Sequence, residues 1–471
     1  MHQTKFALAM LAAAVLAGCG GASGGDQTLK VKYTAQVSFG DSLSDVGSYA
    51  VGTVLAKGGG KFTINGDNTK INPELTGKNW TEHLAAQFSL AAPCAAETGP
   101  EGNAAQGLSV ARVKHAGCFG YAMGGSRVTN PVGPNNKLTG SALGALTVPV
   151  VTQIANHLAV SGGKFSGTEA VFVMAGGNDV LYQLGALQAG ATAAGQAAGA
   201  KAGADAGAKA FATNLVAALA ARAANPATAA QAIGAAVATA SAAPGATSAS
   251  IVGAAVTAAA TAGDTAVAAP AVYSPLVAKA QADATVTGNA AGAAAGAKAG
   301  ADYAAAQGPT LVASMKQAGT ELVALVKDQI IAKGANYVVV NNLPDVAGTP
   351  SGLSKDANTK ALINAMVSAF NGELSAGLNG NAKVLLVDVF AVSHDQGVNP
   401  GPYGLTNVTD TACDLTAPGN ILGSSLVCNG TNLKAGDVSH YAYADDVHPT
   451  PFNNLLLARF VAKEMVVRGW L

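Results

Sequence analysis

A serine near one end of the chain and a histidine near the other have the residue types needed for nucleophilic catalysis. Ser42 directly follows an apolar run, and His448 comes three residues after Asp445. A serine hydroxyl becomes a useful nucleophile only when a base takes its proton, and a histidine oriented by a carboxylate is a common base. Asp445 could hold His448 through Nδ1 and leave Nε2 for Ser42. An Asp-x-x-His pair alone is usually a loop salt bridge, so the interpretation requires further groups.

Groups that could stabilise a developing oxyanion occur in two other segments. Asn178, in the segment 176–179, offers its side-chain amide. Gly124 and Gly125 offer backbone N–H groups that no Cβ shields, and the N–H of Ser42 is a further donor. Each of these signals is weak alone, because Gly-Gly turns are common. Together with the serine and the histidine they predict acyl transfer through a covalent acyl-enzyme.

Short apolar runs precede several of these groups, and they are the elements that must position them. Each run is bounded by polar residues, Gly or Pro, which is typical of a parallel strand covered on both faces. The runs are residues 35–39, 169–175, 336–341 and 383–389. Helical patterns lie between them at 80–88, 311–333 and 359–378. This alternation predicts a three-layer α/β/α sandwich, with the chemistry at the carboxyl ends of its strands.

The segment 185–308 breaks this pattern because it consists almost entirely of Ala, Gly, Thr and Ser. Residues 194–205 return almost unchanged at 291–302, and Gly recurs at every fourth position in both copies. On a helix this spacing puts the glycines on one face, where another backbone could approach closely. We interpret the segment as an insertion of Ala-rich helices whose two arms pack together. Partial disorder is the alternative, because Gly is unfavourable in helices and little large apolar area is present. Neither interpretation supplies catalytic groups.

The first residues have the pattern of an export signal. Residues 1–18 combine Lys5 with a short apolar stretch, and they end in small residues before Cys19. This resembles the signal of bacterial lipoproteins, in which the cysteine carries lipid and becomes the mature N-terminus. Residues 19–30 would then be the lipidated cysteine and a flexible tether. The absence of Asp after Cys19 favours the outer membrane, on its periplasmic or surface face. An ordinary cleaved signal with a chance cysteine is the alternative.

The other four cysteines fit an oxidising compartment. Four cysteines allow three pairings, and the spacings favour the local pairs Cys94–Cys118 and Cys413–Cys428. Free buried thiols are the alternative. No cysteine pair has the C-x-x-C spacing of zinc or redox sites, which argues against those functions.

Composition excludes several other classes of protein. The 471 residues carry 27 Lys+Arg and 27 Asp+Glu, and only 11% are charged, so no broad positive field is available for nucleic acid. No second apolar run reaches the ~18 residues of a membrane span, which excludes a polytopic membrane protein. The sequence contains no HExxH motif, Cys/His cluster or phosphate loop, so we expect no metal or cofactor.

Four blocks, in order along the chain, resemble those of the GDSL or SGNH hydrolase superfamily. The blocks are residues 40–45, 122–125, 177–179 and 445–449. The resemblance implies a flavodoxin-like sandwich. It also implies Ser42 as nucleophile, His448 as general base and then acid, and Asp445 as its orienting group. Ser42, Gly125 and Asn178 would form the oxyanion hole.

Two of these assignments have neighbouring alternatives. The second block allows a shift of one residue, so Gly124 remains possible in place of Gly125. Asp446 lies beside Asp445, although the spacing to the histidine favours Asp445.

The chain departs from the family pattern in two places. The second block often begins with Asn, but Gly120 and Tyr121 stand in that region, which puts the local geometry in doubt. The insertion is also long for the family, and it could affect access of substrate to the site. No barrel-forming segment follows His448, so the chain resembles the passenger of autotransporter esterases without the translocator.

Some other residues invite assignment to the site but have simpler interpretations. Residues 21–25 match the G-x-S-x-G motif, but they lie in the expected tether and lack the flanking strand and helix. His83 lies on an amphipathic helix and is expected at its surface or boundary. His394, His440 and Tyr403 could line an acyl pocket, although loop residues of this kind are more often structural.

The sequence therefore predicts a serine esterase or lipase that hydrolyses carboxylic esters and is attached to the bacterial envelope. Its hydrolase domain would comprise residues 31–184 and 309–471, split by the insertion. The expected partners are an ester substrate, either a lipid or a small acyl ester, and a membrane reached through the lipid anchor. One alternative is an acyltransferase with the same acyl-enzyme, and another is a non-enzymatic surface lipoprotein. The acyl chain length and the alcohol cannot be deduced from the sequence.

Overall fold

The computed structural model describes residues 30–73, 75–145 and 147–471. The expected signal peptide, the lipidation site Cys19 and nearly all of the tether lie outside the described residues. The chain divides into two compact units. One comprises the residues up to Leu181 together with Val312–Leu471, and the other comprises Tyr182–Leu311.

A sheet of four parallel strands forms the centre of the first unit. Its order is β1-β4-β5-β6, and each strand lies in one of the four segments predicted from the apolar runs. The strands are β1 (Gln36–Gly40), β4 (Ala170–Met174), β5 (Tyr337–Asn341) and β6 (Val384–Val387). The register aligns the last residues of neighbouring strands, so Gly40 pairs with Met174 and Met174 with Asn341. The predicted α/β class and its parallel sheet are confirmed.

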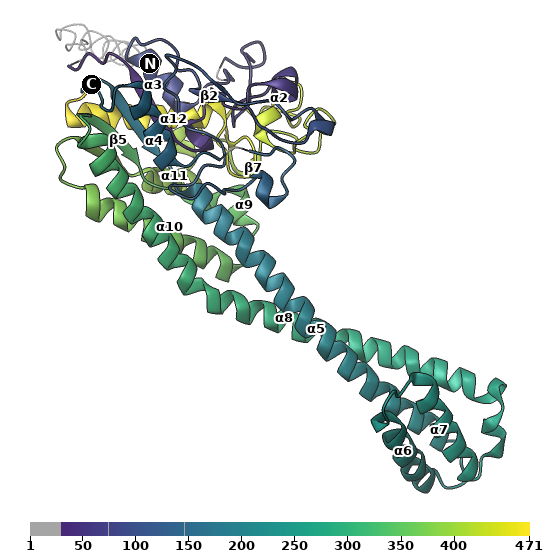
Figure 1. Ribbon diagram of the computed structural model, residues 1–471. Coiled ribbons are helices and arrows are strands. Elements are labelled where there is room, and N and C mark those ends of the chain that lie inside the picture. The colour runs from purple at the N-terminus through teal and green to yellow at the C-terminus, as the bar shows by residue number, and fades with distance from the viewer. Residues whose placement is uncertain (1–29, 74, 146) are drawn as a thin grey trace, which may run out of the picture. The chain divides into compact units, whose positions relative to one another are not determined.

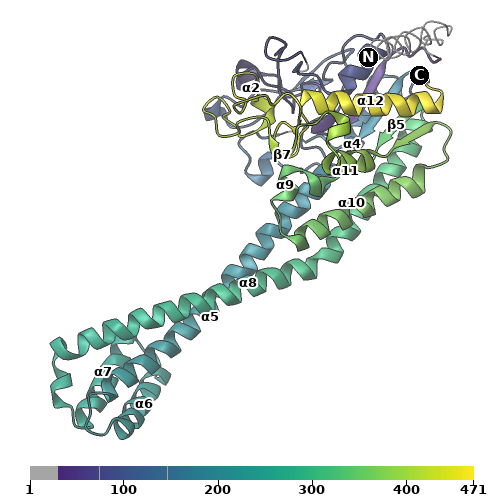
Figure 2. The ribbon, with the colours of Figure 1, turned by 180° about the vertical axis from the view of Figure 1, so that it is seen from behind.

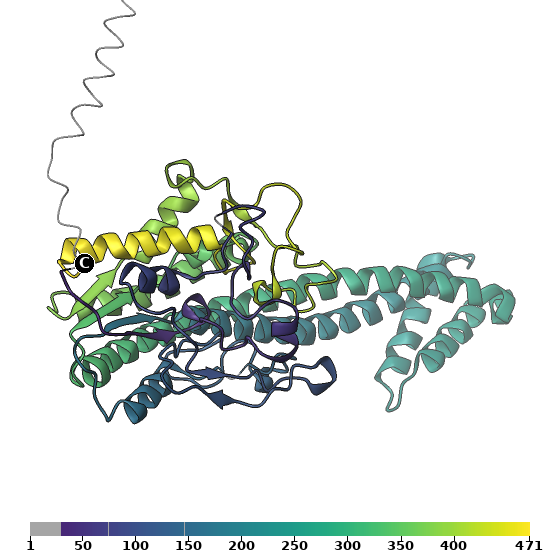
Figure 3. The ribbon, with the colours of Figure 1, turned by 90° about the horizontal axis from the view of Figure 1, so that it is seen from above.

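One face of this sheet is covered by α3 (Trp80–Gln87) and α12 (Pro451–Arg468). Trp80 and Met465 are both fully buried, and they belong to one apolar cluster with Phe172 of β4. Figure 3 shows α12 on one side of the sheet and α4 (Val150–Val160) on the other. This cluster anchors the segments before α3 and before α12, and both segments contribute to the site.

The connecting helices cover the opposite face. Successive strands are neighbours in the sheet, so right-handed crossovers put the helix that leads into each next strand on the same side. The earlier α3, also between β1 and β4, is the exception and packs with α12 on the first face. These helices are α4, the end of α8 with the π-helical turn η5 (Leu325–Ile331), and α10 (Ala357–Leu378). Gly319 of α8 lies against Phe370 of α10, where a methyl group would be 2.9 Å from the Phe370 carbonyl oxygen. Figure 1 shows α10 alongside this part of α8.

The remaining elements of the first unit are short. Two small sheets pair β2 (Glu97–Thr98) with β3 (Val113–Lys114) and β7 (Asn407–Thr411) with β8 (Tyr441–Tyr443). Three more α-helices are α2 (Gly52–Ala56), α9 (Pro350–Leu353) and α11 (Val389–Val398). Single 3₁₀ turns are η1 (Ser42–Ser44), η2 (Ala104–Gln106), η3 (Lys137–Thr139), η6 (Val346–Gly348), η7 (Gly401–Tyr403) and η8 (Ser425–Val427). Disulfides join Cys94 to Cys118 and Cys413 to Cys428, the pairing favoured by the sequence.

The second unit is entirely helical. It contains α6 (Pro226–Ala242), α7 (Ser248–Thr261), η4 (Thr265–Ala268), most of α5 (Gly177–Ala220) and the larger part of α8 (Pro270–Ala324). Figure 2 shows α6 and α7 packed side by side. Their apolar cluster includes the fully buried Ile233, Leu215, Leu219 and Val267. No helix in the described part of the chain combines the length and apolar character needed to cross a membrane.

The two copies of the repeat pair as antiparallel arms through their glycines. A methyl group at Gly195 would lie 2.8 Å from the carbonyl oxygen of Gly296, and one at Gly199 would lie 2.8 Å from that of Gly292. Real Cβ atoms do not come so close to a backbone oxygen, so the absence of side chains allows this approach of α5 and α8. The four-residue spacing of the glycines therefore places each one where the backbone of the other arm approaches closely.

We predict that alanine has opposite effects at paired and unpaired glycines. Gly195→Ala/Gly199→Ala should lower the midpoint of thermal unfolding of the insertion, because both new methyl groups meet backbone of α8. Gly234→Ala/Gly253→Ala should raise the midpoint, because these helix positions face open space and each alanine should stabilise its helix by about 0.5–1 kcal/mol. Circular dichroism at 222 nm measures the helix signal. Equal effects of the two double substitutions would contradict this account.

Candidate active site

The nucleophile candidate is positioned by a clamp at the end of β1. Gly40 adopts a φ of +151° and packs directly on the backbone of Met174. The buried amide of Gln153 holds Gly40 from both sides, since Oε1 accepts its N–H at 2.8 Å and Nε2 donates to its carbonyl at 2.8 Å. Asp41 then caps η1 by accepting the N–H of Leu43 at 3.1 Å. Ser42 therefore begins a 3₁₀ turn at the carboxyl end of a buried strand.

The three residues expected to form the triad are in contact. His448 Nε2 lies 2.9 Å from Ser42 Oγ, and His448 Nδ1 lies 2.8 Å from Asp445 Oδ1. Asp445 is buried, and it also accepts the N–H groups of His448 at 2.9 Å and Ser425 at 2.8 Å. The adjacent Asp446 is exposed. The arrangement gives Ser42 a base whose orientation is set by a buried carboxylate.

The environment of Asp445 keeps it ionised. Burial alone would raise the pKa of this carboxyl, but the charge of His448 and hydrogen bonds from His448 and Ser425 hold it well below its ordinary value. An ionised Asp445 accepts from Nδ1–H, which leaves Nε2 free of a proton and able to take one from Ser42. The required tautomer follows from this electrostatic balance.

The side chain and backbone groups expected to stabilise an oxyanion lie at the same cavity as Ser42 and His448. The N–H of Gly124 donates to Asp45 Oδ2 at 2.9 Å, so this group is already engaged. Gly125, with a φ of +79°, lines the cavity beside Ser42. Asn178, in the first turn of α5, lines the same cavity, and its Nδ2 also donates to the Ser126 carbonyl at 2.9 Å. This geometry favours Gly125 over Gly124 as the backbone donor.

Asp45 is a residue whose structural role the sequence did not reveal. Its buried carboxylate accepts the N–H groups of Gly47 at 2.9 Å and Ser48 at 2.7 Å, besides that of Gly124. Burial raises the pKa of Asp45, against the opposing effect of these hydrogen bonds. One side chain therefore joins the loop after Ser42 to the loop that carries Gly125. Only contacts between distant loops define this role, so no local pattern could have predicted it.

Phe62 is a second residue that the sequence did not point to. The centre of its ring lies 4.8 Å from that of His448, and it lines the same cavity. A methyl group at Gly124 would collide with this ring, so Phe62 fills the space between His448 and the loop that carries Gly124 and Gly125. The Tyr49 hydroxyl donates to the Gly124 carbonyl at 2.9 Å on the same side. Phe62 thus limits the movement of the imidazole.

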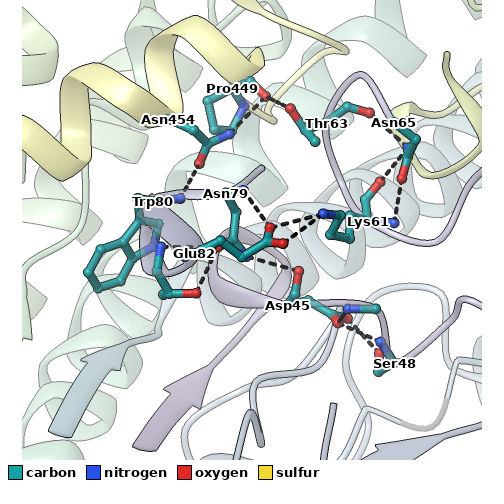
Figure 4. A network of polar contacts seen from close by, with 12 residues as sticks. Asp45, Ser48, Lys61, Thr63, Asn65, Asn79, Trp80, Glu82, Pro449 and Asn454 are labelled. Atoms are coloured by element: carbon teal, nitrogen blue, oxygen red, sulfur yellow. Dashed lines mark hydrogen bonds and ion pairs between the residues drawn. The ribbon is translucent and has the colours of Figure 1, made fainter. Parts of the chain in front are cut away.

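A polar network connects the loops around the nucleophile and the histidine (Figure 4). Thr63 Oγ1 donates to the carbonyl of Pro449, the residue after His448, at 2.9 Å. Asn79 Nδ2 donates to the Asp45 carbonyl at 3.0 Å, while the Asn79 N–H donates to Glu82 Oε2 at 2.8 Å in a capping box. Glu82 also pairs with Lys61 at 2.9 Å. The start of α3 therefore ties three segments of the site together.

Asp41 adds a second titratable group beside the nucleophile. It is buried and lines the cavity, and burial raises its pKa to about 7, with the nearby charge of His448 acting in the opposite direction. A protonated Asp41 removes a negative charge from the neighbourhood of Ser42. An oxyanion forming there would be repelled less when Asp41 is neutral.

The cavity at these residues has a volume of about 150 Å³ and joins polar and apolar walls. Ser42, His448, Gly125 and Asn178 form its polar side. Apolar walls come from Leu43, Phe62, Pro134, Met174, Leu181, Leu343, Pro344, Val346 and Val447. Such a site could hold a small acyl group against the serine.

Three loop residues considered for an acyl pocket lie elsewhere. His394 Nδ1 is 2.8 Å from Asp345, His440 stacks on Phe452, and the Tyr403 hydroxyl donates to Asp395 at 2.6 Å. None of them is among the described residues that line the cavity. His83 lies on α3, where burial lowers its pKa to about 4. His83, His394, His440 and Tyr403 therefore contact or pack against other parts of the fold and do not line the candidate active site.

The described residues contain no group of three or more His, Cys, Asp or Glu side chains that could hold a metal ion. A comparison with protein-family models and with curated proteins finds no match for this chain. The functional conclusion for this chain therefore depends on the geometry of the site itself.

We predict that the two disulfides contribute differently to the site. Cys413 donates its N–H to the Ala444 carbonyl at 3.0 Å, and Ser425, three residues before Cys428, donates to Asp445. Cys413→Ala/Cys428→Ala should therefore slow the labelling of Ser42 by a serine-reactive phosphonate about tenfold or more, because a misplacement of about 1 Å can cost ~10²-fold in rate. Cys94→Ala/Cys118→Ala is the matched control.

The control should lose a similar ~3 kcal/mol of stability, because the two disulfides close loops of 15 and 24 residues. Its labelling rate should stay near that of the wild type at a temperature where both variants are folded. Equal slowing in the two variants would contradict a specific role for the Cys413–Cys428 loop.

Proposed function

We propose that this protein is a serine hydrolase that cleaves carboxylic esters through an acyl-enzyme on Ser42. The observation that carries the proposal is the hydrogen-bonded series from Asp445 through His448 to Ser42. Ser42 lines a cavity that Gly125 and Asn178 also line. A nucleophile, a base, an orienting carboxylate and opposing donors are the complete set of groups that ester hydrolysis requires.

The first half of the reaction forms the acyl-enzyme. Ser42 Oγ attacks the ester carbonyl carbon while His448 Nε2 takes its proton. The carbonyl oxygen becomes an oxyanion that accepts hydrogen bonds from the N–H groups of Ser42 and Gly125 and from the amide of Asn178. The bond to the alcohol oxygen then breaks, and His448 returns the proton to that oxygen. The alcohol leaves, and the acyl group remains on Ser42.

The second half releases the acid. His448 takes a proton from water, which attacks the acyl carbon and forms a second oxyanion. Collapse of this intermediate breaks the bond to Ser42 Oγ, and His448 gives the proton back to the serine. Asp445 remains ionised throughout and stabilises the imidazolium in both halves.

Membership of the GDSL or SGNH superfamily is the finer part of this proposal. It is supported by a parallel sheet with helices on both faces and by the four ordered sequence blocks. All four blocks supply residues that line one cavity, and the fourth supplies the histidine. The four described strands follow chain order, β1-β4-β5-β6, and match the 1-3-4-5 part of the flavodoxin-like order 2-1-3-4-5; the flavodoxin-like sandwich therefore stays part of the proposal.

We predict that Ser42→Ala will abolish hydrolysis of p-nitrophenyl esters from acetate to palmitate, with a loss of at least about 10⁴-fold in kcat. The adjacent residues Asp445 and Asp446 provide a matched pair of substitutions, one in the proposed triad and one outside it. Asp445→Asn should cost about 10⁴-fold because the wrong histidine tautomer is favoured, whereas Asp446→Asn should keep near wild-type activity. Release of p-nitrophenol measures the rate, and circular dichroism checks folding.

Two results would count against the proposal. Hydrolysis that survives in Ser42→Ala would show that another group is the nucleophile. A folded wild-type protein that hydrolyses no ester would argue against an esterase, and adding an alcohol acceptor would then test whether the acyl group is transferred instead of hydrolysed.

The proposed location is the bacterial envelope, with the enzyme attached through lipid on Cys19. Its support is the residue pattern before Cys19, together with two disulfides, which suit an exported protein. Cys19→Ser should move the protein from the membrane fraction to the soluble fraction of expressing cells and remove incorporation of labelled palmitate. Continued labelling of the Cys19→Ser protein would contradict lipidation at this position.

A further inference from the structure

A second, smaller cavity lies directly behind the proposed active site. It has a volume of about 70 Å³, and the described residues that line it carry no charged side chain. It shares a wall with the active-site cavity. The residues that line both cavities are Leu43, Met174, Pro344, Thr349 and Val447. The far side of the second cavity is formed by α11 and α12, with Val392, Leu456 and Leu457 among its lining residues.

The positions of the polar groups indicate which part of an ester lies against the apolar wall of the active-site cavity. The leaving alcohol must take a proton from His448 and reach solvent, so we place it beside His448 and away from the apolar wall. The acyl group stays attached to Ser42 through both halves of the reaction. It therefore belongs against the apolar wall, next to Leu43 and Met174. Met174 is 2% exposed, and the Asn341 amide donates to its sulfur at 3.6 Å.

On the basis of the proposed esterase function, we propose that this wall makes the enzyme selective for short acyl chains and that Met174 sets the limit. A cavity of about 150 Å³ accepts a group the size of benzene, which corresponds to roughly six carbon atoms. An acyl chain up to hexanoyl would then fit, and the next carbons would meet Met174. The substrate class is therefore esters of short fatty acids, and long-chain lipids are excluded from productive binding.

The second cavity predicts how this limit can be moved. Shortening Met174 should join the two cavities and add space for about three more carbon atoms, since 70 Å³ is roughly half of the 150 Å³ that holds about six. Octanoate is then the longest ester of the series that still fits. Val392 lines only the second cavity, so a larger residue there should fill the added space without touching the first cavity. The two substitutions form a double-mutant cycle, in which the change at Met174 joins the second cavity to the first and the change at Val392 fills it again.

The experiment measures kcat/KM for p-nitrophenyl acetate, butyrate, hexanoate, octanoate and decanoate. In the wild type, kcat/KM should rise about fourfold per added methylene up to hexanoate and then fall. Met174→Ala should move the optimum to octanoate. Val392→Phe alone should leave the wild-type profile unchanged, and Met174→Ala/Val392→Phe should return the optimum to hexanoate.

Met174→Val provides a second opening substitution that suits a strand, in case Met174→Ala fails to fold. Folded, active Met174 variants with the wild-type profile would overturn the proposal, and so would a wild type that prefers decanoate. These outcomes differ from failure of the esterase function itself. In that case no ester would be hydrolysed in a Ser42-dependent way, and the acyl-chain proposal would fail with it.

Discussion

The contact between Ser42 and His448 joins residues 406 positions apart, and much of the structure serves to hold that contact at 2.9 Å. Ser42 is placed by β1, the edge strand of the sheet, through the clamp of Gln153 on Gly40. His448 is placed by the start of α12, which packs on α3 over the same face of the sheet. The loops between them are connected by side-chain hydrogen bonds to backbone carbonyls, which fix position without adding bulk in the site.

Four buried aspartates around this contact do different work because their surroundings differ. Asp445 is held ionised by His448, while burial raises the pKa of Asp41 beside the nucleophile. Asp45 anchors two loops through backbone N–H groups. Asp179 accepts from Arg127 at 2.8 Å and from the Val128 N–H at 3.1 Å, which holds the chain just after the oxyanion loop. The same functional group therefore serves as an electrostatic partner of the histidine, as a carboxyl with a raised pKa beside the nucleophile, and as a structural anchor.

The sequence predicted the parts of this protein that depend on local patterns. The four strands were predictable because each is a short apolar run, and the paired arms of the insertion because Gly recurs at every fourth position in both copies of the repeat. The contact of Ser42 with His448 and Asp445 was predictable only because four sequence blocks occur together in order, since an Asp-x-x-His pair alone is usually a loop salt bridge. The choice between Gly124 and Gly125 was not, because it depends on which N–H group the distant Asp45 occupies. Phe62 and the cavity behind Met174 come from loop packing, which leaves no periodic signal in the sequence.

The glycine-paired arms have a consequence for the order in which the protein can form. Strands β4 and β5 are neighbours in the sheet, yet the 130 residues of Tyr182–Leu311 are synthesised between them. Residues 175–336, 162 in all, separate the two strands, so at 5–20 residues per second β4 leaves the ribosome roughly 8–32 s before its partner strand, with one edge unpaired. An exposed edge invites pairing with other chains. Helices built from Ala and Gly form locally and offer few large apolar groups to such chains, and their pairing brings the two ends of the insertion together before β5 arrives. The Ala- and Gly-rich composition of the insertion therefore suits a segment that must not promote aggregation while β4 still lacks its partner strand.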